Sequence, residues 1–164
     1  MKILSIFSWL TVLWIVNVFL SSLPYKFTLH PDTQHIFGTI GYWLQSILGD
    51  SIGNAFAHYG AYLVGSAELL VSILLLSPLM FWLARKLTAL KETPPRSLIH
   101  AIGGLFASAI MAGAAFFHLF TPLGVEVLHD GKSDGGSLFY AAVSIFVLGL
   151  ILSVVNFIAY KKNR

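Results

Sequence analysis

The sequence predicts an all-α fold: an integral membrane four-helix bundle that forms one domain over residues 1–164. Hydrophobic residues make up 57% of the chain, whereas charged residues make up 10%. The mean hydropathy of +0.80 is too high for a chain of this length with a solvated surface. The apolar residues also gather in four long segments, at residues 3–20, 59–83, 98–120 and 138–160. We therefore place the chain in a lipid bilayer.

The segment at residues 3–20 is the first predicted transmembrane helix. An α-helix rises 1.5 Å per residue, so about 20 residues cross about 30 Å of hydrocarbon. Lys2 precedes the apolar run, as in a secretory signal, but Ser21-Ser22-Leu23-Pro24 is not an A-x-A-like cleavage site. We expect this segment to remain as a membrane span.

Residues 33–48 are amphipathic but too few to be a further span. Their apolar side chains are Phe37, Ile40, Tyr42, Trp43, Leu44, Ile47 and Leu48. We expect part of this segment to form an interfacial helix in the first outer loop, covering the mouth of the bundle. A lipid anchor with no role as a lid is the alternative.

The second predicted span, residues 59–83, carries one acidic residue in its apolar run. Ala61, Gly65, Glu68 and Ser72 recur at spacings of three and four, which gives the helix a small and polar stripe. Glu68 should therefore point into the bundle, roughly 13 Å below the outer interface. An unpaired carboxylate is costly there, so we expect it to be protonated or matched by a hydrogen-bond donor.

The third predicted span, residues 98–120, should be the central helix. Small residues let helix backbones approach in lipid, and here they are Gly103, Gly104, Ala107, Ser108, Ala112 and Ala115. His118 follows them just before Thr121 and Pro122, in the same outer half as Glu68. We expect the ring and the carboxylate to face one interior as a coupled titrating pair. An interhelical hydrogen bond with no chemistry is the alternative.

The basic residues predict the orientation of the bundle. Eight of the ten lie at the chain ends or in the connection at residues 84–97: Lys2, Arg85, Lys86, Arg96, Lys91, Lys161, Lys162 and Arg164. The connection contains Glu92-Thr93-Pro94-Pro95 and is typical of a surface linker. Because cytoplasmic connections are enriched in lysine and arginine, we expect an N-in/C-in topology.

Several function classes can be set aside. A pI of about 9.3 is accounted for by the positive-inside pattern, so we expect no nucleic acid partner. The absence of cysteine excludes a CxxC oxidoreductase. The outer histidines lack an i, i+4 helical spacing, so we predict no metal site. No organised nucleophile or phosphate loop is visible, and we do not expect the chain to be an enzyme by itself.

Four stretches together resemble a known family. They are LPYKFTLHPDTQHIFGTIG, GSAELLVSILLL, GGLFASAIMAGAAFFHLFTPLG and DGGSLFYAAVSIFVLGLIL, and they cover nearly the whole chain. In this order they resemble the signature regions of the DoxX-like family of small bacterial membrane proteins, with Lys26, Glu68, His118 and Asp134-Gly135-Gly136 at the matching positions. Leu29 stands where many relatives carry glycine.

The resemblance implies a multi-pass protein of the bacterial inner membrane. Some DoxX-like proteins are associated with oxidoreductase complexes, such as thiosulfate:quinone oxidoreductase or superoxide-detoxifying assemblies. The predicted partners are therefore the lipid bilayer and a redox partner protein or quinone, with a homo-oligomer as a further option.

The resemblance also indicates a pocket that opens outward. Lys26 could reach Glu68 along its own stem, and His118 would complete the cluster. Asp134 or Asp130 would close it from above, and Asn17 would add a neutral group. Such a pocket suits a quinone head group or a small sulfur-containing or acidic solute. Three hypotheses follow: an accessory redox or quinone-binding subunit, a small-solute transport or binding protein, and an assembly scaffold.

Overall fold

The computed structural model describes residues 2–88 and 92–163 and is 84% helical, with five helices. The elements are α1 (Lys2–Phe27), α2 (Pro31–Leu48), α3 (Asp50–Leu87), α4 (Arg96–Phe120), β1 (Leu128–His129), β2 (Lys132–Ser133) and α5 (Ser137–Lys162). Helices α1, α3, α4 and α5 are each long and apolar enough to cross a membrane, so the four predicted apolar helices are present. Lys91 and Arg164, two of the basic residues counted above, lie outside the described residues.

The observed helices extend beyond the apolar segments that predicted them. Helix α3 has 38 residues and begins at Asp50, so residues 50–58 continue the helix expected at 59–83. Helix α1 likewise continues to Phe27, past the predicted end at residue 20. Hydropathy detects the part of a helix that lipid covers, whereas backbone hydrogen bonding continues through polar residues until a break such as Gly49, which has a φ of +87°.

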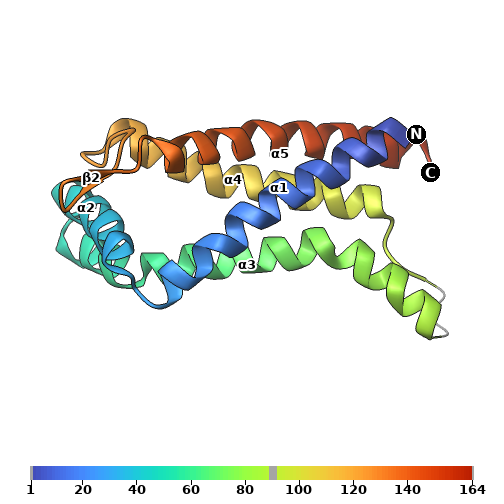
Figure 1. Ribbon diagram of the computed structural model, residues 1–164, viewed down its shortest axis with the longest axis horizontal. Coiled ribbons are helices and arrows are strands. Elements are labelled where there is room, and N and C mark those ends of the chain that lie inside the picture. Colours follow the sequence, from blue (N-terminus) through green and yellow to red (C-terminus); the bar gives the residue numbers. More distant parts are fainter. Residues whose placement is uncertain (1, 89–91, 164) are drawn as a thin grey trace.

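The closest helix pair is α4 with α5, which lie side by side (Figure 1). A Cβ on Gly104 would lie 2.7 Å from the carbonyl oxygen of Gly149, so a larger residue cannot fit without a shift. The hydroxyl of Ser108 donates to the carbonyl oxygen of Phe146 at 2.7 Å. Small residues thus let the two backbones approach, as the stripe on residues 98–120 predicted.

Apolar side chains from all four spans form the main core. They are Val12, Ile15, Val16 and Phe19 from α1, Val71 and Leu75 from α3, Ala107 and Met111 from α4, and Ala142, Ile145 and Leu152 from α5. A buried polar contact also joins α5 to α1, where Asn156 Nδ2 donates to Ser8 Oγ at 2.9 Å. The amide also donates to the carbonyl oxygen of Leu152, so it is buried with partners.

A second layer covers one end of the bundle, where α2, the beginning of α3 and the β-hairpin gather (Figure 1). Gly41 of α2 lies so close to α3 that a Cβ there would be 2.7 Å from the Cβ of Ala57. Ile40 and Leu44 of α2 pack with Leu123 and Val127 of the connection after α4. The helix expected within residues 33–48 therefore exists, and its apolar face packs against protein.

The two chain ends lie together at the opposite end of the molecule (Figure 1). The connection between α3 and α4 is at this end as well, so the described basic residues of these three regions share it: Lys2, Arg85, Lys86, Arg96, Lys161 and Lys162. An even number of long helices accounts for this arrangement, because four successive helices return the chain to the end where it started. We call the end of the molecule where these basic residues lie the basic end of the bundle.

Candidate functional site

The candidate site is an ion pair between Lys26 of α1 and Glu68 of α3. Lys26 Nζ lies 2.7 Å from Glu68 Oε2 and 2.9 Å from Oε1. The side chain of Glu68 is 3% exposed and that of Lys26 is 15% exposed. Glu68 thus points into the bundle, as its stripe of small residues predicted, and its donor is the lysine at the end of α1.

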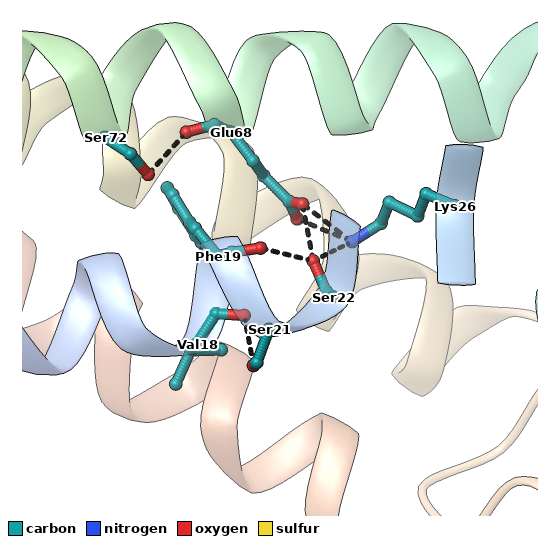
Figure 2. Close-up of polar contacts among 7 residues, drawn as sticks. All are labelled: Val18, Phe19, Ser21, Ser22, Lys26, Glu68 and Ser72. Carbon is teal, nitrogen blue, oxygen red and sulfur yellow. Dashed lines mark hydrogen bonds and ion pairs between the residues drawn. The ribbon is translucent and has the colours of Figure 1, made fainter. Parts of the chain in front are cut away.

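Ser22 is the third member of this site, and no sequence pattern distinguished it from the other serines. It lies one turn before Lys26 on α1, and its hydroxyl accepts a hydrogen bond from Lys26 Nζ at 2.7 Å. The same hydroxyl lies 2.9 Å from Glu68 Oε2 and 2.7 Å from the carbonyl oxygen of Phe19 (Figure 2). Because a hydroxyl has one proton, it donates to one of these two acceptors at a time.

Two features of α3 fit it to receive this lysine. Gly65 lies one turn before Glu68, and a Cβ there would be 3.4 Å from both Cβ and Cδ of Lys26. The lysine stem therefore lies against the bare backbone of α3. On the next turn, Ser72 Oγ donates to the carbonyl oxygen of Glu68 at 2.8 Å (Figure 2). The repeat of Gly65, Glu68 and Ser72 thus gives lysine access on one side and backbone support on the other.

The cluster of Ser22, Lys26 and Glu68 is electrically neutral as a unit when both charged groups are ionised. In a low-dielectric interior, each charge would be costly alone, and removal of one partner leaves the other uncompensated. Each of the three protons of Lys26 Nζ has an acceptor, in the two carboxylate oxygens and the serine hydroxyl. The arrangement can hold α1 against α3, and its ammonium group can donate to a carbonyl or anionic group of a ligand that replaces one of these three acceptors.

The structure places His118 in a different contact from the one expected. Its Nδ1 lies 2.7 Å from the carbonyl oxygen of Gly124, and its ring packs edge-on against Phe139 at a centroid distance of 5.8 Å. The side chain joins the end of α4 to the following connection and to α5. Among the described residues, no hydrogen bond or ion pair joins His118 to Glu68, so the expected coupled pair is replaced by two separate contacts.

Asp134 anchors the first turn of α5 instead of closing a pocket above Glu68. Its Oδ1 accepts from the backbone N–H of Val127 at 2.8 Å and of Gly136 at 3.0 Å, and its Oδ2 accepts from that of Leu138 at 3.0 Å. Burial raises the pKa of Asp134, but the N–H groups of Leu138, Gly136 and Val127 outweigh that effect and hold the pKa below its ordinary value. The carboxylate thus organises the chain before α5.

Asp130 and Asn17 also lie apart from the ion pair. Asp130 and Gly131 have φ values of +48° and +73° between the paired residues His129 and Lys132. Aspartate followed by glycine is typical of such a two-residue hairpin turn, so Asp130 has a turn role. Asn17 lies on the exposed face of α1. Of the predicted site residues, the structure therefore brings together Lys26 and Glu68.

Three histidines, His30, His35 and His129, form a surface cluster around Asp32, the second residue of α2. His129 Nδ1 lies 2.7 Å from Asp32 Oδ1, and His30 Nδ1 lies 3.3 Å from Asp32 Oδ2. The ring of His35 stacks on that of His129 at 4.6 Å. The hydrogen bond from His129 is the main cause that lowers the pKa of Asp32. No group of three or more histidine, aspartate or glutamate residues within the described chain has a geometry that could hold a metal ion.

His100 is a buried histidine near the start of α4, outside the candidate site. It is completely buried on α4, and its ring packs edge-on against Trp9 of α1 at a centroid distance of 4.9 Å. Within the described residues, neither ring nitrogen has a hydrogen-bond partner. Composition alone could not place it inside the bundle, because its position near the start of a span is equally compatible with an interface.

The resemblance to DoxX-like proteins stays a prediction, since the motifs that support it are short. In comparisons with protein-family models, curated proteins and solved structures, nothing matches this chain.

Proposed function

We propose that this protein is a non-catalytic accessory subunit of a membrane redox system, and that it binds a quinone or a similar amphipathic ligand at the cluster of Ser22, Lys26 and Glu68. The observation that supports this proposal is a lysine ammonium group, largely removed from water, beside a buried carboxylate. Such a group is a strong donor to a ligand carbonyl, because a charge-assisted hydrogen bond strengthens in a low dielectric.

Ser22 is the partner that a ligand would replace. A carbonyl oxygen that accepts from Lys26 Nζ would take the place of the Ser22 hydroxyl, and the bonds to both carboxylate oxygens would remain. The released hydroxyl would keep an acceptor in the Phe19 carbonyl oxygen. The aromatic rings of Phe27 and Tyr62, whose centroids are 6.4 Å apart, belong to the same two helices and supply apolar surface for a ring-shaped ligand.

We place the protein in the bacterial cytoplasmic membrane with its basic end toward the cytoplasm. The positive-inside pattern supports this orientation, since six described basic residues share that end with both chain termini. In this orientation the Lys26–Glu68 pair lies in the outer half of the membrane, and α2 lies at the outer interface. The redox partner protein would then meet the covering layer of α2 and the connection before α5.

A scaffold or assembly role is the second candidate, and the completeness of the cluster favours it. All three ammonium protons have acceptors within the chain, so the fold satisfies Lys26 without a ligand. In this role the ion pair would specify how α1 packs on α3, as buried polar groups do in other helix assemblies.

Extraction of bound molecules from purified protein separates the two candidates. The protein, Lys26→Gln and the control Asn17→Ala would be purified in mild detergent, and the quinones in each preparation would be quantified by chromatography and mass spectrometry. Ligand binding at the cluster predicts a quinone that is retained by the protein and by Asn17→Ala and is lost from Lys26→Gln. Equal quinone content in all three, at the level of the detergent blank, would favour the scaffold.

A further inference from the structure

A groove at the basic end of the bundle forms a site unrelated to the Lys26–Glu68 pair. Two neighbouring cavities, of about 440 and 340 Å³, share Pro78, Trp82 and Arg96. The larger is completed by Ser5 and Trp9 of α1 and Leu79 of α3. The smaller continues toward the connection between α3 and α4, where Thr93, Pro94 and Pro95 line it.

The path of α3 creates this groove. Toward its C-terminal end, α3 runs away from α1 and α4 (Figure 1). Pro78 lies in this part of the helix and has no backbone N–H, so it cannot make the hydrogen bond that would continue the helix ladder. Ser77 Oγ instead donates to the Leu74 carbonyl oxygen at 2.7 Å. The space between the diverging helices is bounded by aromatic and aliphatic side chains.

Charge is distributed unevenly around the groove. Arg96 is half-buried in its wall and donates to Ser5 Oγ at 2.7 Å, which fixes its guanidinium group between α1 and α4. Arg85 lines the smaller cavity, and Lys86 Nζ lies 5.9 Å from the centroid of the Trp82 ring. No acidic side chain lines either cavity, and no salt bridge joins Arg96 to an acidic residue within the described chain.

We propose that this groove binds one anionic phospholipid, with its phosphate on Arg96 and an acyl chain along Trp9, Leu79 and Trp82. A guanidinium group has five N–H donors in a planar fork that suits phosphate oxygens, and the bond to Ser5 uses one of them. Leu79 and Trp82 are 52% and 58% exposed, so the apolar wall is open to lipid. Basic pockets between membrane helices commonly bind anionic head groups in this way.

The occupant is a phospholipid and not a soluble anion because the groove combines a cationic group, Arg96, with an apolar wall. Tryptophan prefers the level of the lipid head groups, where its ring is in apolar surroundings and its N–H near water. Trp9 and Trp82 thus place the groove at that level, and Arg96 lies at the first residue of α4, where the span begins. A free phosphate would use the guanidinium group and leave the apolar wall uncovered.

Native mass spectrometry of the delipidated protein tests this proposal. The protein would be titrated with phosphatidylglycerol and with phosphatidylcholine of the same acyl chains, and binding of the first lipid would be quantified. We expect phosphatidylglycerol to bind more tightly, and Arg96→Gln to weaken its binding about tenfold, because a charge-assisted contact is lost. Lys162→Gln removes the same charge at the same end from an exposed position on α5 and should change binding less than twofold.

Further variants keep the result interpretable if Arg96→Gln folds poorly. Arg96→Lys retains the charge but loses the planar fork and should bind with intermediate affinity. Trp82→Ala keeps every charge and should weaken the binding of both lipids. If Arg96→Gln and Lys162→Gln weakened the binding of phosphatidylglycerol equally, the proposal would be overturned in favour of diffuse electrostatic attraction to the basic end. Competition by inorganic phosphate with phosphatidylglycerol, together with no effect of Trp82→Ala, would overturn it in favour of a soluble anion.

Discussion

Lys26 Nζ donates to both carboxylate oxygens of Glu68, at 2.9 and 2.7 Å, and so joins α1 to α3 within the membrane-spanning part of the bundle. Ser22 bridges the two charged groups. The pair combines a nearly inaccessible carboxylate with a lysine that enters from the end of its helix, where its stem lies along Gly65. This geometry makes the response to single and double substitutions predictable.

Replacement of Glu68 should destabilise the protein to a degree that depends on what replaces it. Glu68→Leu leaves Lys26 buried without a counter-charge, and we expect a loss of about 3–5 kcal/mol, the usual cost of breaking a buried pair. Glu68→Gln keeps an acceptor for Lys26 and Ser22 and should lose less. Thermal unfolding in detergent gives the order of stability.

The double variant Lys26→Met/Glu68→Leu removes both charges together. It should be more stable than Glu68→Leu alone, because no uncompensated charge remains. A double variant that loses the sum of the two single effects would show that the residues act independently.

Substitution at the α4–α5 contact should be far more damaging than at a nearby open position. Gly149→Ala would bring a Cβ to 2.6 Å from Ser108 Oγ and 2.8 Å from the Gly104 carbonyl oxygen. We expect a loss of about 1–3 kcal/mol from overpacking. Gly113→Ala on α4 is the matched control, because a Cβ there meets nothing within 4 Å, and it should leave the melting temperature unchanged or raise it. Equal melting temperatures would contradict the close packing.

Asp134 should stabilise the start of α5 in a manner that depends on pH. Its pKa in the fold lies below the ordinary value of 3.8, so its contribution is fully present above that value and is lost as the pH falls through the folded pKa. Amide hydrogen exchange at Leu138 should therefore be flat near neutral pH once corrected for intrinsic rates, and should rise only in acid. Asp134→Ala should raise the exchange rate at Leu138 at neutral pH and lower the stability of the fold by about 1 kcal/mol. Asp130→Asn is the control, since asparagine tolerates the positive φ of that turn.

His118 should hold the connection after α4 through the Gly124 carbonyl oxygen. His118→Leu leaves that carbonyl without its partner, at a cost of about 1–3 kcal/mol if it stays dry. We expect faster hydrogen exchange over residues 121–127, whereas His58→Leu, on an exposed position of α3, should have no such effect. Unchanged exchange in His118→Leu would show that the connection is held by its apolar contacts alone.

Topology reporters test the orientation. Fusions in the connection between α3 and α4 and at the C-terminus should both report the cytoplasm, because both lie at the basic end. An insertion in the hairpin turn at Gly131 should report the opposite side. A periplasmic signal from either of the first two fusions would contradict this orientation and, with it, the placement of the Lys26–Glu68 pair in the outer half.

The sequence by itself determined the number of spans, the small-residue face of α4 and the inward direction of Glu68. These features depend on local composition and on the 3.6-residue period of the α-helix. Lipid favours the helix because every backbone N–H and C=O group must find its hydrogen-bond partner within the protein. The tertiary structure decided which polar groups meet. The sequence predicted Glu68 and His118 in one half of the membrane and on small-residue faces, but depth and periodicity do not fix the rotation and tilt of one helix against another. Packing at Gly65 brings Lys26 to Glu68, and the turn after α4 brings the Gly124 carbonyl oxygen to His118. The half-buried Ser22 and the buried Asn156 follow the same rule, because each has a hydrogen-bond partner on another helix.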